Sequence, residues 1–262
     1  MARANAKKGG KSHRKLLMVG PEAPFQFVEA YKSLRTNLEF LSASTGCKTI
    51  LITSSVPEEG KSNVAINLAA TLAAGGKKVV LVDGDLRKGA LSRYLHLNRN
   101  RPGISNVVAG QCAVTEALVR FKNVQFTLLP VGPLPPNPSE MLALPAVESL
   151  FQGLREYYDF VIVDTPPVSL VTDAAVMCRF ADGVVLVVRP GVTTVQGAQL
   201  SKKNLEAVHA HILGVVLNGY DIKRAGHKDG YYYSYSYDYY KHDGDEDDGR
   251  DDGRDDGRDD GE

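Results

Sequence analysis

The sequence contains little cysteine, with three residues among 262. Cys47, Cys112 and Cys178 lie far apart, form no C-x-x-C pair and have no histidine at metal-ligand spacing. This pattern indicates neither a disulfide framework nor a zinc site. It fits a chain that stays in a reducing cytoplasm.

Long apolar runs are also missing. No segment approaches the roughly 20 consecutive apolar residues that span a bilayer. The basic N-terminus is not followed by the apolar stretch of a secretory signal. We therefore expect any contact with a membrane to go through a partner protein.

The formal net charge is zero, because 31 Lys and Arg balance 31 Asp and Glu. The balance hides an asymmetry between the ends of the chain. Residues 1–15 carry six basic and no acidic side chains, whereas residues 242–262 carry twelve acidic side chains against three Arg. Since the body between them is nearly balanced, the sequence predicts no nucleic-acid partner.

Short apolar, β-branched runs alternate with segments of helical period. Each run is too continuous to be half exposed, which predicts buried parallel strands. The alternation predicts an α/β fold with a doubly wound, mostly parallel sheet. The predicted strands span residues 49–53, 79–82, 126–129, 160–163, 184–188 and 212–217, and the predicted helices span 62–74, 146–157 and 194–208.

Composition divides the chain into three parts. Residues 1–20 form a basic, flexible N-terminus, residues 21–222 the α/β domain, and residues 223–262 a flexible tail that cannot bury enough apolar area to fold alone. Within the domain, residues 27–41 form an amphipathic helix ahead of the first strand. Its apolar face could pack internally or against another subunit.

A phosphate-binding loop is the sharpest motif. Gly60-Lys61-Ser62 follows a buried strand and a short loop and opens a helix, as a P-loop requires. Backbone N–H groups would surround the phosphates of ATP, with a Lys charge at the β and γ positions and a Ser hydroxyl on Mg²⁺. Ser55 stands where the G-x-x-x-x-G-K-[ST] pattern has its first Gly. The predicted nucleotide-binding residues of the loop are Glu59, Gly60, Lys61, Ser62 and Asn63.

Three carboxylates follow two of the predicted strands. Asp83 and Asp85 come after residues 79–82, and Asp164 comes after residues 160–163. Ligands of such sheets bind at the carboxyl ends of the strands, beside the P-loop. Carboxylates there can hold Mg²⁺ or accept a proton from an attacking hydroxyl. One such Asp alone would favour a turn or a helix cap, but the set predicts an ATP and Mg²⁺ site.

Six motifs in order resemble the bacterial tyrosine kinases of exopolysaccharide and capsule assembly. That family shares the doubly wound P-loop fold of the septum-site and partition ATPases, and the similarity runs from about residue 21 to residue 221. The motifs are PEAP (21–24) with EAYKSLRTN (29–37), the P-loop, DGDLR (83–87), PGISN (102–106), GPLPPNPSE (132–140) and DTPP (164–167).

The resemblance implies a role for each residue of the site. Lys61 and Ser62 would bind phosphate and Mg²⁺. Asp83 would be the base that takes the tyrosyl proton. Asp85 and Asp164 would organise the metal together with Ser62, which makes Lys61, Asp83, Asp85 and Asp164 the implied catalytic set.

Two further features follow from the resemblance. Asn218 would face the nucleotide base. The oligomerisation helix of the family reads E-x-x-R-x-x-R, and the matching residues here are Glu29, Lys32 and Arg35. Because Lys cannot make the bidentate fork of Arg, we expect a tendency to self-associate, with a ring-like homo-oligomer as one form. Internal packing of this helix is the alternative.

A tyrosine cluster occupies residues 231–240. Taken alone, its Tyr-Ser alternation predicts an edge strand or a sticky low-complexity segment. Beside a tyrosine kinase domain, it is interpreted as an autophosphorylation cluster that reaches a neighbour in trans. The acidic repeat at residues 243–262 suggests no function. The predicted acceptors are Tyr231, Tyr232, Tyr233, Tyr235, Tyr237, Tyr239 and Tyr240.

The sequence thus favours an ATP-dependent protein-tyrosine autokinase, and the resemblance implies that it would regulate exopolysaccharide or capsule polymerisation and export. As the resemblance implies, it would be cytoplasmic and docked at the inner face of the inner membrane by a transmembrane chain-length regulator, with a phosphotyrosine phosphatase as another partner. A partition or septum-type ATPase switch is the alternative, although that class carries an early P-loop lysine that this chain lacks. A nucleotide-binding regulatory subunit is a third.

Overall fold

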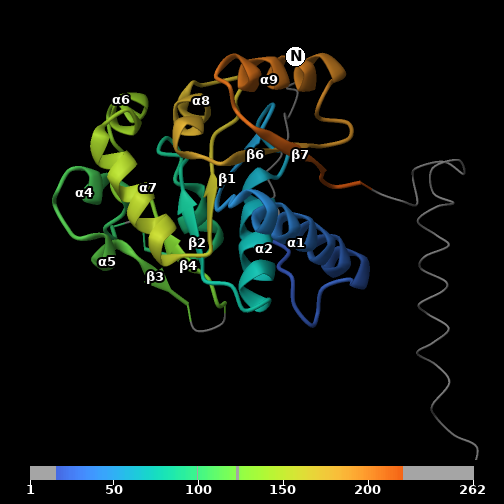
Figure 1. The fold of residues 1–262 in the computed structure, drawn as a ribbon, viewed down its shortest axis with the longest axis horizontal. Helices are drawn as coiled ribbons and strands as arrows, with labels where there is room; N and C mark the ends of the chain where they lie inside the picture. Colours follow the sequence, from blue (N-terminus) through green and yellow to red (C-terminus); the bar gives the residue numbers. More distant parts are fainter. Residues whose placement is uncertain (1–15, 99, 122–123, 221–262) are drawn as a thin grey trace, which may run out of the picture. The chain divides into compact units, whose positions relative to one another are not determined.

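One sheet organises the computed structural model, which describes residues 16–98, 100–121 and 124–220. In this part of the chain, a seven-stranded sheet has the order β3-β4-β2-β5-β1-β6-β7 (Figure 1). The predicted N-terminus, tail and tyrosine cluster lie largely or wholly outside these residues, so their boundaries stay predictions. The strands are β1 (Thr49–Ser54), β2 (Val79–Asp83), β3 (Val119–Arg120), β4 (Thr127–Leu129), β5 (Phe160–Asp164), β6 (Gly183–Val188) and β7 (Ile212–Leu217).

Neighbouring strands run parallel except β3, which pairs with β4 in the antiparallel sense. All six predicted strands are present within about a residue, which confirms the mostly parallel α/β fold. The two-residue β3 was not predicted, because so short a segment carries no periodic pattern.

The prediction of full burial was wrong for β7. Val215 is 60% exposed and Leu217 is 52% exposed. Among the described residues, β7 is the last strand of the sheet and pairs with β6 alone, so it has a neighbouring strand on one side only. An apolar run therefore indicates a strand here without indicating that both of its faces are covered.

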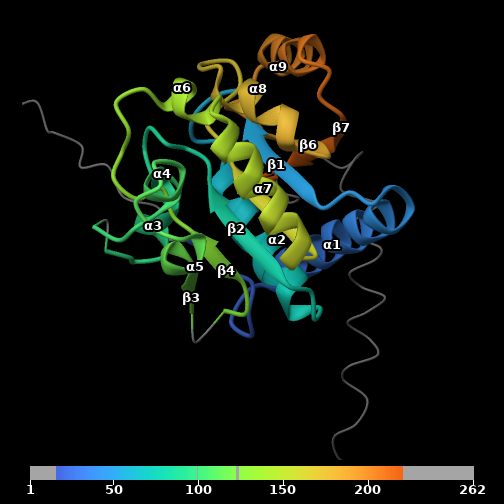
Figure 2. The same ribbon diagram turned by 60° about the vertical axis from the view of Figure 1, so that its left-hand side comes forward.

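Helices cover both faces of the sheet, as Figures 1 and 2 show. Within the described residues, none of these helices is both long and apolar enough to cross a membrane. The helices are α1 (Phe25–Thr45), α2 (Lys61–Ala74), α3 (Ala90–Tyr94), α4 (Ile104–Val108), α5 (Val114–Ala117), α6 (Pro138–Leu142), α7 (Pro145–Tyr157), α8 (Asp173–Met177) and α9 (Val195–Ala207), with a 3₁₀ turn at Cys178–Phe180.

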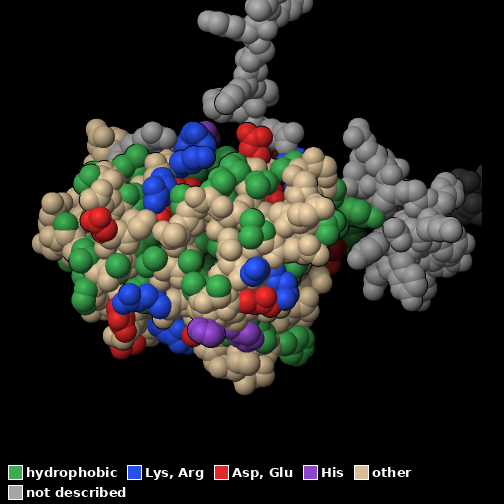
Figure 3. Space-filling view, turned by 90° about the horizontal axis from the view of Figure 1, so that it is seen from above, with side chains coloured by type: hydrophobic (Ala, Val, Ile, Leu, Met, Phe, Trp, Pro, Cys, Tyr) green, Lys and Arg blue, Asp and Glu red, His purple; other side chains and the backbone are tan. Residues whose placement is uncertain are grey.

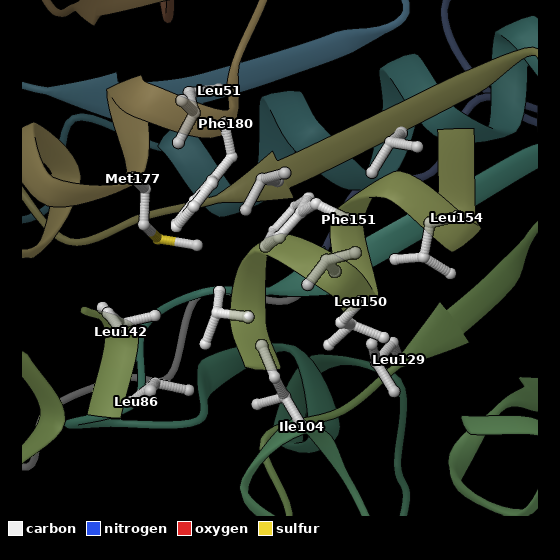
Figure 4. Packing of buried hydrophobic residues seen from close by; sticks show 14 of the residues in the cluster. Leu51, Leu86, Ile104, Leu129, Leu142, Leu150, Phe151, Leu154, Met177 and Phe180 are labelled. Atoms are coloured by element: carbon white, nitrogen blue, oxygen red, sulfur yellow. The ribbon is translucent and has the colours of Figure 1, made fainter. Parts of the chain in front are cut away.

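The hydrophobic core lies in two layers, one on each side of the sheet. On one side, α7 buries an apolar stripe whose period of three to four residues is typical of a helix on a sheet (Figure 4). Phe151 of this stripe stacks on Phe180, with ring centroids 5.5 Å apart. On the other side, α2 contributes more of the buried side chains than any other element, in keeping with its position against β1, β2 and β5.

The predicted amphipathic helix is α1, which is longer than residues 27–41 at both ends. Tyr31 and Leu38 are buried, and Nη1 of Arg35 donates a hydrogen bond to the carbonyl oxygen of Thr71 in α2 (3.3 Å). One face of α1 therefore packs within the molecule.

On the surface of the described residues seen in Figure 3, basic and acidic side chains lie interspersed rather than in one field.

Candidate active site

The P-loop (residues 55–62) connects the end of β1 to the first turn of α2. Gly60 has a φ of 92°, which a side chain would strain. A Cβ atom at this position would lie 2.0 Å from Nδ2 of Asn218. The same nitrogen donates a hydrogen bond to the carbonyl oxygen of Glu59 (2.8 Å). The residue after β7 therefore touches the P-loop directly, and glycine is required at this contact.

Strand order brings the carboxylates to the P-loop. β5 lies between β1 and β2, and Asp164 at its end is the register partner of Asp83 at the end of β2. Asp85 follows two residues later, after Gly84, whose N–H donates to the carbonyl oxygen of Asp164 (2.8 Å). A Cβ at Gly84 would lie 2.9 Å from that oxygen, so only glycine allows this close approach. The three predicted aspartates therefore lie at one edge of the sheet.

Lys61 reaches into this group of carboxylates. Its Nζ lies 3.3 Å from Oδ1 of Asp164 and 3.9 Å from Oδ2 of Asp85, and it donates a hydrogen bond to Oγ of Ser62 (3.2 Å). Burial lowers the pKa of Lys61, but the neighbouring carboxylates outweigh burial and raise it above the ordinary value. Lys61 therefore keeps its positive charge at neutral pH, as phosphate binding requires.

Asp83 is fully buried. Burial raises the pKa of its carboxyl group well above the ordinary value, and the negative charge of Asp164 raises it further. Its Oδ2 accepts a hydrogen bond from the N–H of Leu91 (3.0 Å), while its Oδ1 has no partner among the described residues. A carboxylate with a raised pKa and a free oxygen is suited to accept a proton.

The residues present fit a magnesium ion. Asp164 is fully buried, burial raises the pKa of its carboxyl group, and its Oδ2 has no partner in the described part of the chain. With Ser62 and Asp85, this side chain offers hard oxygen ligands beside a phosphate-binding loop. No described group of three or more His, Cys, Asp or Glu forms a metal cage. Magnesium usually needs only one or two carboxylates, because waters and substrate phosphates supply its other ligands.

Sequence reasoning missed two hydrogen bonds of a buried side chain that hold the P-loop in shape. Glu59 is fully buried, and its Oε2 accepts a hydrogen bond from the N–H of Val56 (2.9 Å). The hydroxyl group of Thr193 donates to its Oε1. Glu59 therefore holds the shape of the loop with its side chain, and the P-loop motif alone gave no signal for Thr193, which follows β6.

The other predicted site residues have less direct places. Oδ1 of Asn63 accepts a hydrogen bond from Asn67 within α2 (2.6 Å). On α1, Lys32 pairs with Glu29 (2.7 Å) and both are about half exposed, whereas Arg35 points toward α2 and lies 3.9 Å from Glu39. Two of the three predicted oligomerisation residues thus lie on the surface and the third is used internally.

The fold and this site define a P-loop nucleotide-binding protein. Comparison with known proteins gives the family. A sequence-family model described as an AAA domain matches residues 47–213. The chain is 38% identical over 78% of its length to tyrosine-protein kinase YwqD of Bacillus subtilis (strain 168), and it covers 85% of that protein. It is 39% identical over 76% of its length to tyrosine-protein kinase etk of Escherichia coli (strain K12), but it spans only 27% of that protein.

Solved structures agree with these relatives. The kinase domain of Escherichia coli tyrosine kinase ETK matches with a TM-score of 0.71 at 34% identity, covering 80% of this chain and 85% of that one. The septum site-determining protein MinD of Pyrococcus horikoshii, complexed with Mg-ADP, matches with a TM-score of 0.56 at 26% identity, covering 70% and 72%. This chain belongs to the bacterial tyrosine-protein kinase family.

Proposed function

We propose that this chain is an autokinase that transfers the γ-phosphate of ATP to the tyrosine cluster at residues 231–240, between copies in trans. The observation that carries the proposal is Asp83. Its buried carboxylate has a raised pKa and one oxygen without a partner among the described residues, and it lies beside the Lys61 and Asp164 pair. A switch ATPase activates water, whereas a tyrosine kinase must accept the phenol proton, and Asp83 is suited to do so.

The proposed transfer is an in-line displacement. The tyrosyl oxygen attacks the γ-phosphorus, its proton passes to Asp83, and the bond from the γ-phosphorus to the β–γ bridging oxygen breaks to leave ADP. Lys61 supplies positive charge at the β- and γ-phosphates. Bound Mg²⁺, which Ser62, Asp85 and Asp164 would hold, supplies charge neutralisation at the same phosphates.

Asn218 is proposed to lie beside the nucleotide, next to the base. Its contact with Gly60 and Glu59 supports a place at the P-loop. Glu59 and Asn63 would belong to the proposed nucleotide site through their main-chain groups rather than through their side chains, which bond within the protein. For Glu59, this assignment follows because its side chain accepts a hydrogen bond from the N–H of Val56 and so does not face a bound nucleotide.

The partners are proposed from the family. A separate transmembrane chain-length regulator would dock the kinase at the inner face of the membrane, and a phosphatase would reset the cluster. The enzyme would thereby regulate exopolysaccharide or capsule polymerisation and export. Self-association through the helix that carries Glu29, Lys32 and Arg35 would bring the cluster to a neighbour's site. Each phosphotyrosine adds roughly −1.5 to −2 charge beside an acidic tail, so phosphorylation would loosen such an assembly.

One experiment tests the reaction. The purified chain is incubated with Mg²⁺ and γ-labelled ATP, and phosphosites are mapped by mass spectrometry, with Lys61→Met and a variant carrying Phe at all seven cluster tyrosines in parallel. Label on residues 231–240 that vanishes with Lys61→Met supports the proposal. ATP hydrolysis without phosphotyrosine, even with a candidate membrane partner present, would instead support the switch ATPase suggested by the likeness to MinD.

A further inference from the structure

A polar cluster outside the candidate active site joins three separate segments of the chain. Arg87 lies in the loop after β2, Ser139 in α6 and Asp173 at the start of α8. Nε and Nη2 of Arg87 each donate to one carboxylate oxygen of Asp173, both at 2.8 Å. The hydroxyl group of Ser139 donates to Oδ1 of Asp173 (2.7 Å) and accepts from Nη2 of Arg87 (3.0 Å). The three side chains thus form a closed set of hydrogen bonds.

The pair of charges in this cluster is ionised and firmly held. Asp173 is fully buried, whereas the side chain of Arg87 is 40% exposed. Burial raises the pKa of Asp173, but the hydrogen bonds from Arg87 and Ser139 outweigh it and leave the pKa below its ordinary value. Two parallel N–H···O bonds fix the guanidinium in both position and orientation. Loss of the carboxylate charge would release Arg87.

The main chain of Arg87 holds a residue of the active site. Its N–H and the N–H of Lys88 both donate to Oδ1 of Asp85, at 3.3 and 3.1 Å. The carbonyl oxygen of Asp85 accepts from the N–H groups of Lys88 and Gly89, which closes the loop into a turn. Oδ2 of Asp85 remains on the side of Lys61, at 3.9 Å. The conformation of the loop around Arg87 therefore sets where the second oxygen of Asp85 points.

Apolar contacts tie the same segments together. Leu86, Leu142 and Met177 are at most 1% exposed and belong to one core cluster, where Figure 4 shows Leu86 beside Leu142. Leu86 thus anchors the loop in the hydrophobic core, while Arg87 anchors the same loop through its hydrogen bonds to Asp173. These contacts come from α6 and α8, which contain none of the predicted catalytic residues.

We propose that Asp173 is a positioning residue for the kinase reaction. It holds Arg87, and Arg87 in turn fixes the loop that presents Asp85 to the metal site. Ser139 supports the same pair. This inference rests on the proposed function, because it gives Asp85 the task of organising Mg²⁺. A merely structural ion pair would change the stability of the protein without changing its requirement for magnesium.

The test uses the full chain with Asp173→Asn, Arg87→Gln and Arg87→Lys, and Arg179→Gln as a matched control. Arg179 pairs with Glu148 at 3.7 Å on the surface, and both are about half exposed. Autophosphorylation rates are measured against ATP and free Mg²⁺, and binding of a fluorescent ATP analogue is titrated with and without Mg²⁺. Thermal unfolding of each variant checks its fold.

With Asp173→Asn we expect kcat to fall about 10- to 100-fold, because small misplacements of catalytic groups cost on this scale. The half-saturating Mg²⁺ concentration should rise several-fold, while analogue affinity without Mg²⁺ stays within about twofold. Arg87→Lys should retain part of the activity, because it keeps the charge but loses the fork. The double variant Arg87→Gln with Asp173→Asn should be no worse than Asp173→Asn, since both act through one contact.

A folded Asp173→Asn with unchanged kcat and unchanged Mg²⁺ requirement would overturn the inference. If that variant does not fold, Ser139→Ala decides, because it keeps the ion pair and should still slow transfer about 2- to 10-fold through one lost hydrogen bond. If the wild-type chain makes no phosphotyrosine, the proposed function fails. The Mg²⁺ dependence of analogue binding then still distinguishes a positioning role for Asp173 from a structural one.

Discussion

Asp83 and Asp164 are register partners at the ends of adjacent strands, and both are fully buried. Two carboxylates so placed resist being charged together, because burial and mutual repulsion both favour the protonated form. Lys61 pairs with Asp164, which leaves Asp83 with the less favourable environment. The unfavourable environment of Asp83 therefore lowers the free energy of unfolding of the protein.

We therefore expect Asp83→Asn to abolish transfer and to raise the free energy of unfolding at pH 7 by roughly 0.5–2 kcal/mol. The pKa of Asp83 is raised in the folded state, first by burial. Its favourable contribution is thus complete below the unfolded pKa and is lost as pH rises through the folded pKa. Urea unfolding should show that the advantage of the variant grows from pH 4 toward pH 7, with Glu156→Gln on the surface of α7 as control. Equal curves at both pH values would contradict this expectation.

Asp182 should show the opposite pH dependence. It accepts hydrogen bonds from the N–H groups of Lys48 and Thr49 (both 2.8 Å) and pairs with Arg155 (2.6 Å). Burial raises its pKa, but these partners outweigh burial and lower it. Its contribution is therefore present above the unfolded pKa and is lost as pH falls through the folded pKa.

Asp182→Asn should lower the free energy of unfolding at pH 7 by about 1–2 kcal/mol, because hydrogen bonds to a charged group are lost at the start of β1. The difference from wild type should shrink in acid. Glu148→Gln, which alters an exposed pair, is the control and should have little effect. A deficit that persists unchanged down to pH 3 would argue against this account.

Gly60→Ala should weaken nucleotide binding at least about tenfold, because a side chain is strained at positive φ and meets Asn218. Gly76→Ala is the matched control. Its φ is 86°, but nothing lies within 4 Å of a Cβ there, so it adds strain without a clash. Binding of a fluorescent ATP analogue should separate the two. Equal losses of affinity would mean that general destabilisation of the protein, not contact with Asn218, is the cause.

Asn218→Ala should weaken binding about 2- to 10-fold through the lost hydrogen bond to Glu59. Stability should change little, because Asn218 follows the last strand and its side chain is only partly buried. Isothermal titration with the analogue measures the affinity. An unchanged affinity would remove Asn218 from the proposed nucleotide site.

Arg35→Ala tests whether α1 serves the fold or self-association. Arg35 contacts Thr71 and lies where a Cβ at Gly75 would come within 3.0 Å of its Nη1. We expect the substitution to lower the free energy of unfolding by roughly 0.5–1.5 kcal/mol. Glu29→Ala should leave stability within about 0.5 kcal/mol and, if the helix joins subunits, reduce the mass measured by sedimentation. An unchanged mass with both variants would remove α1 from the proposed interface.

Local pattern determined much of this protein. The buried runs predicted the six longer strands because parallel strands under helices carry continuous apolar side chains. The P-loop and the aspartates were predicted to form one site because phosphate and magnesium chemistry demands particular residues at the ends of strands. The helix at the N-terminus was recognised from its period, and the structure assigns one of its faces to α2.

Tertiary structure alone decided the rest. Asp83 and Asp164 meet because β5 lies between β1 and β2, and Asn218 reaches Gly60 across the sheet. Val215 is exposed because β7 is the last strand. The contact of Arg87 with Asp173 joins residues 86 positions apart. Periodicity reports whether a side chain faces apolar surroundings, but it does not encode which distant segment supplies them, because that depends on strand order and helix packing.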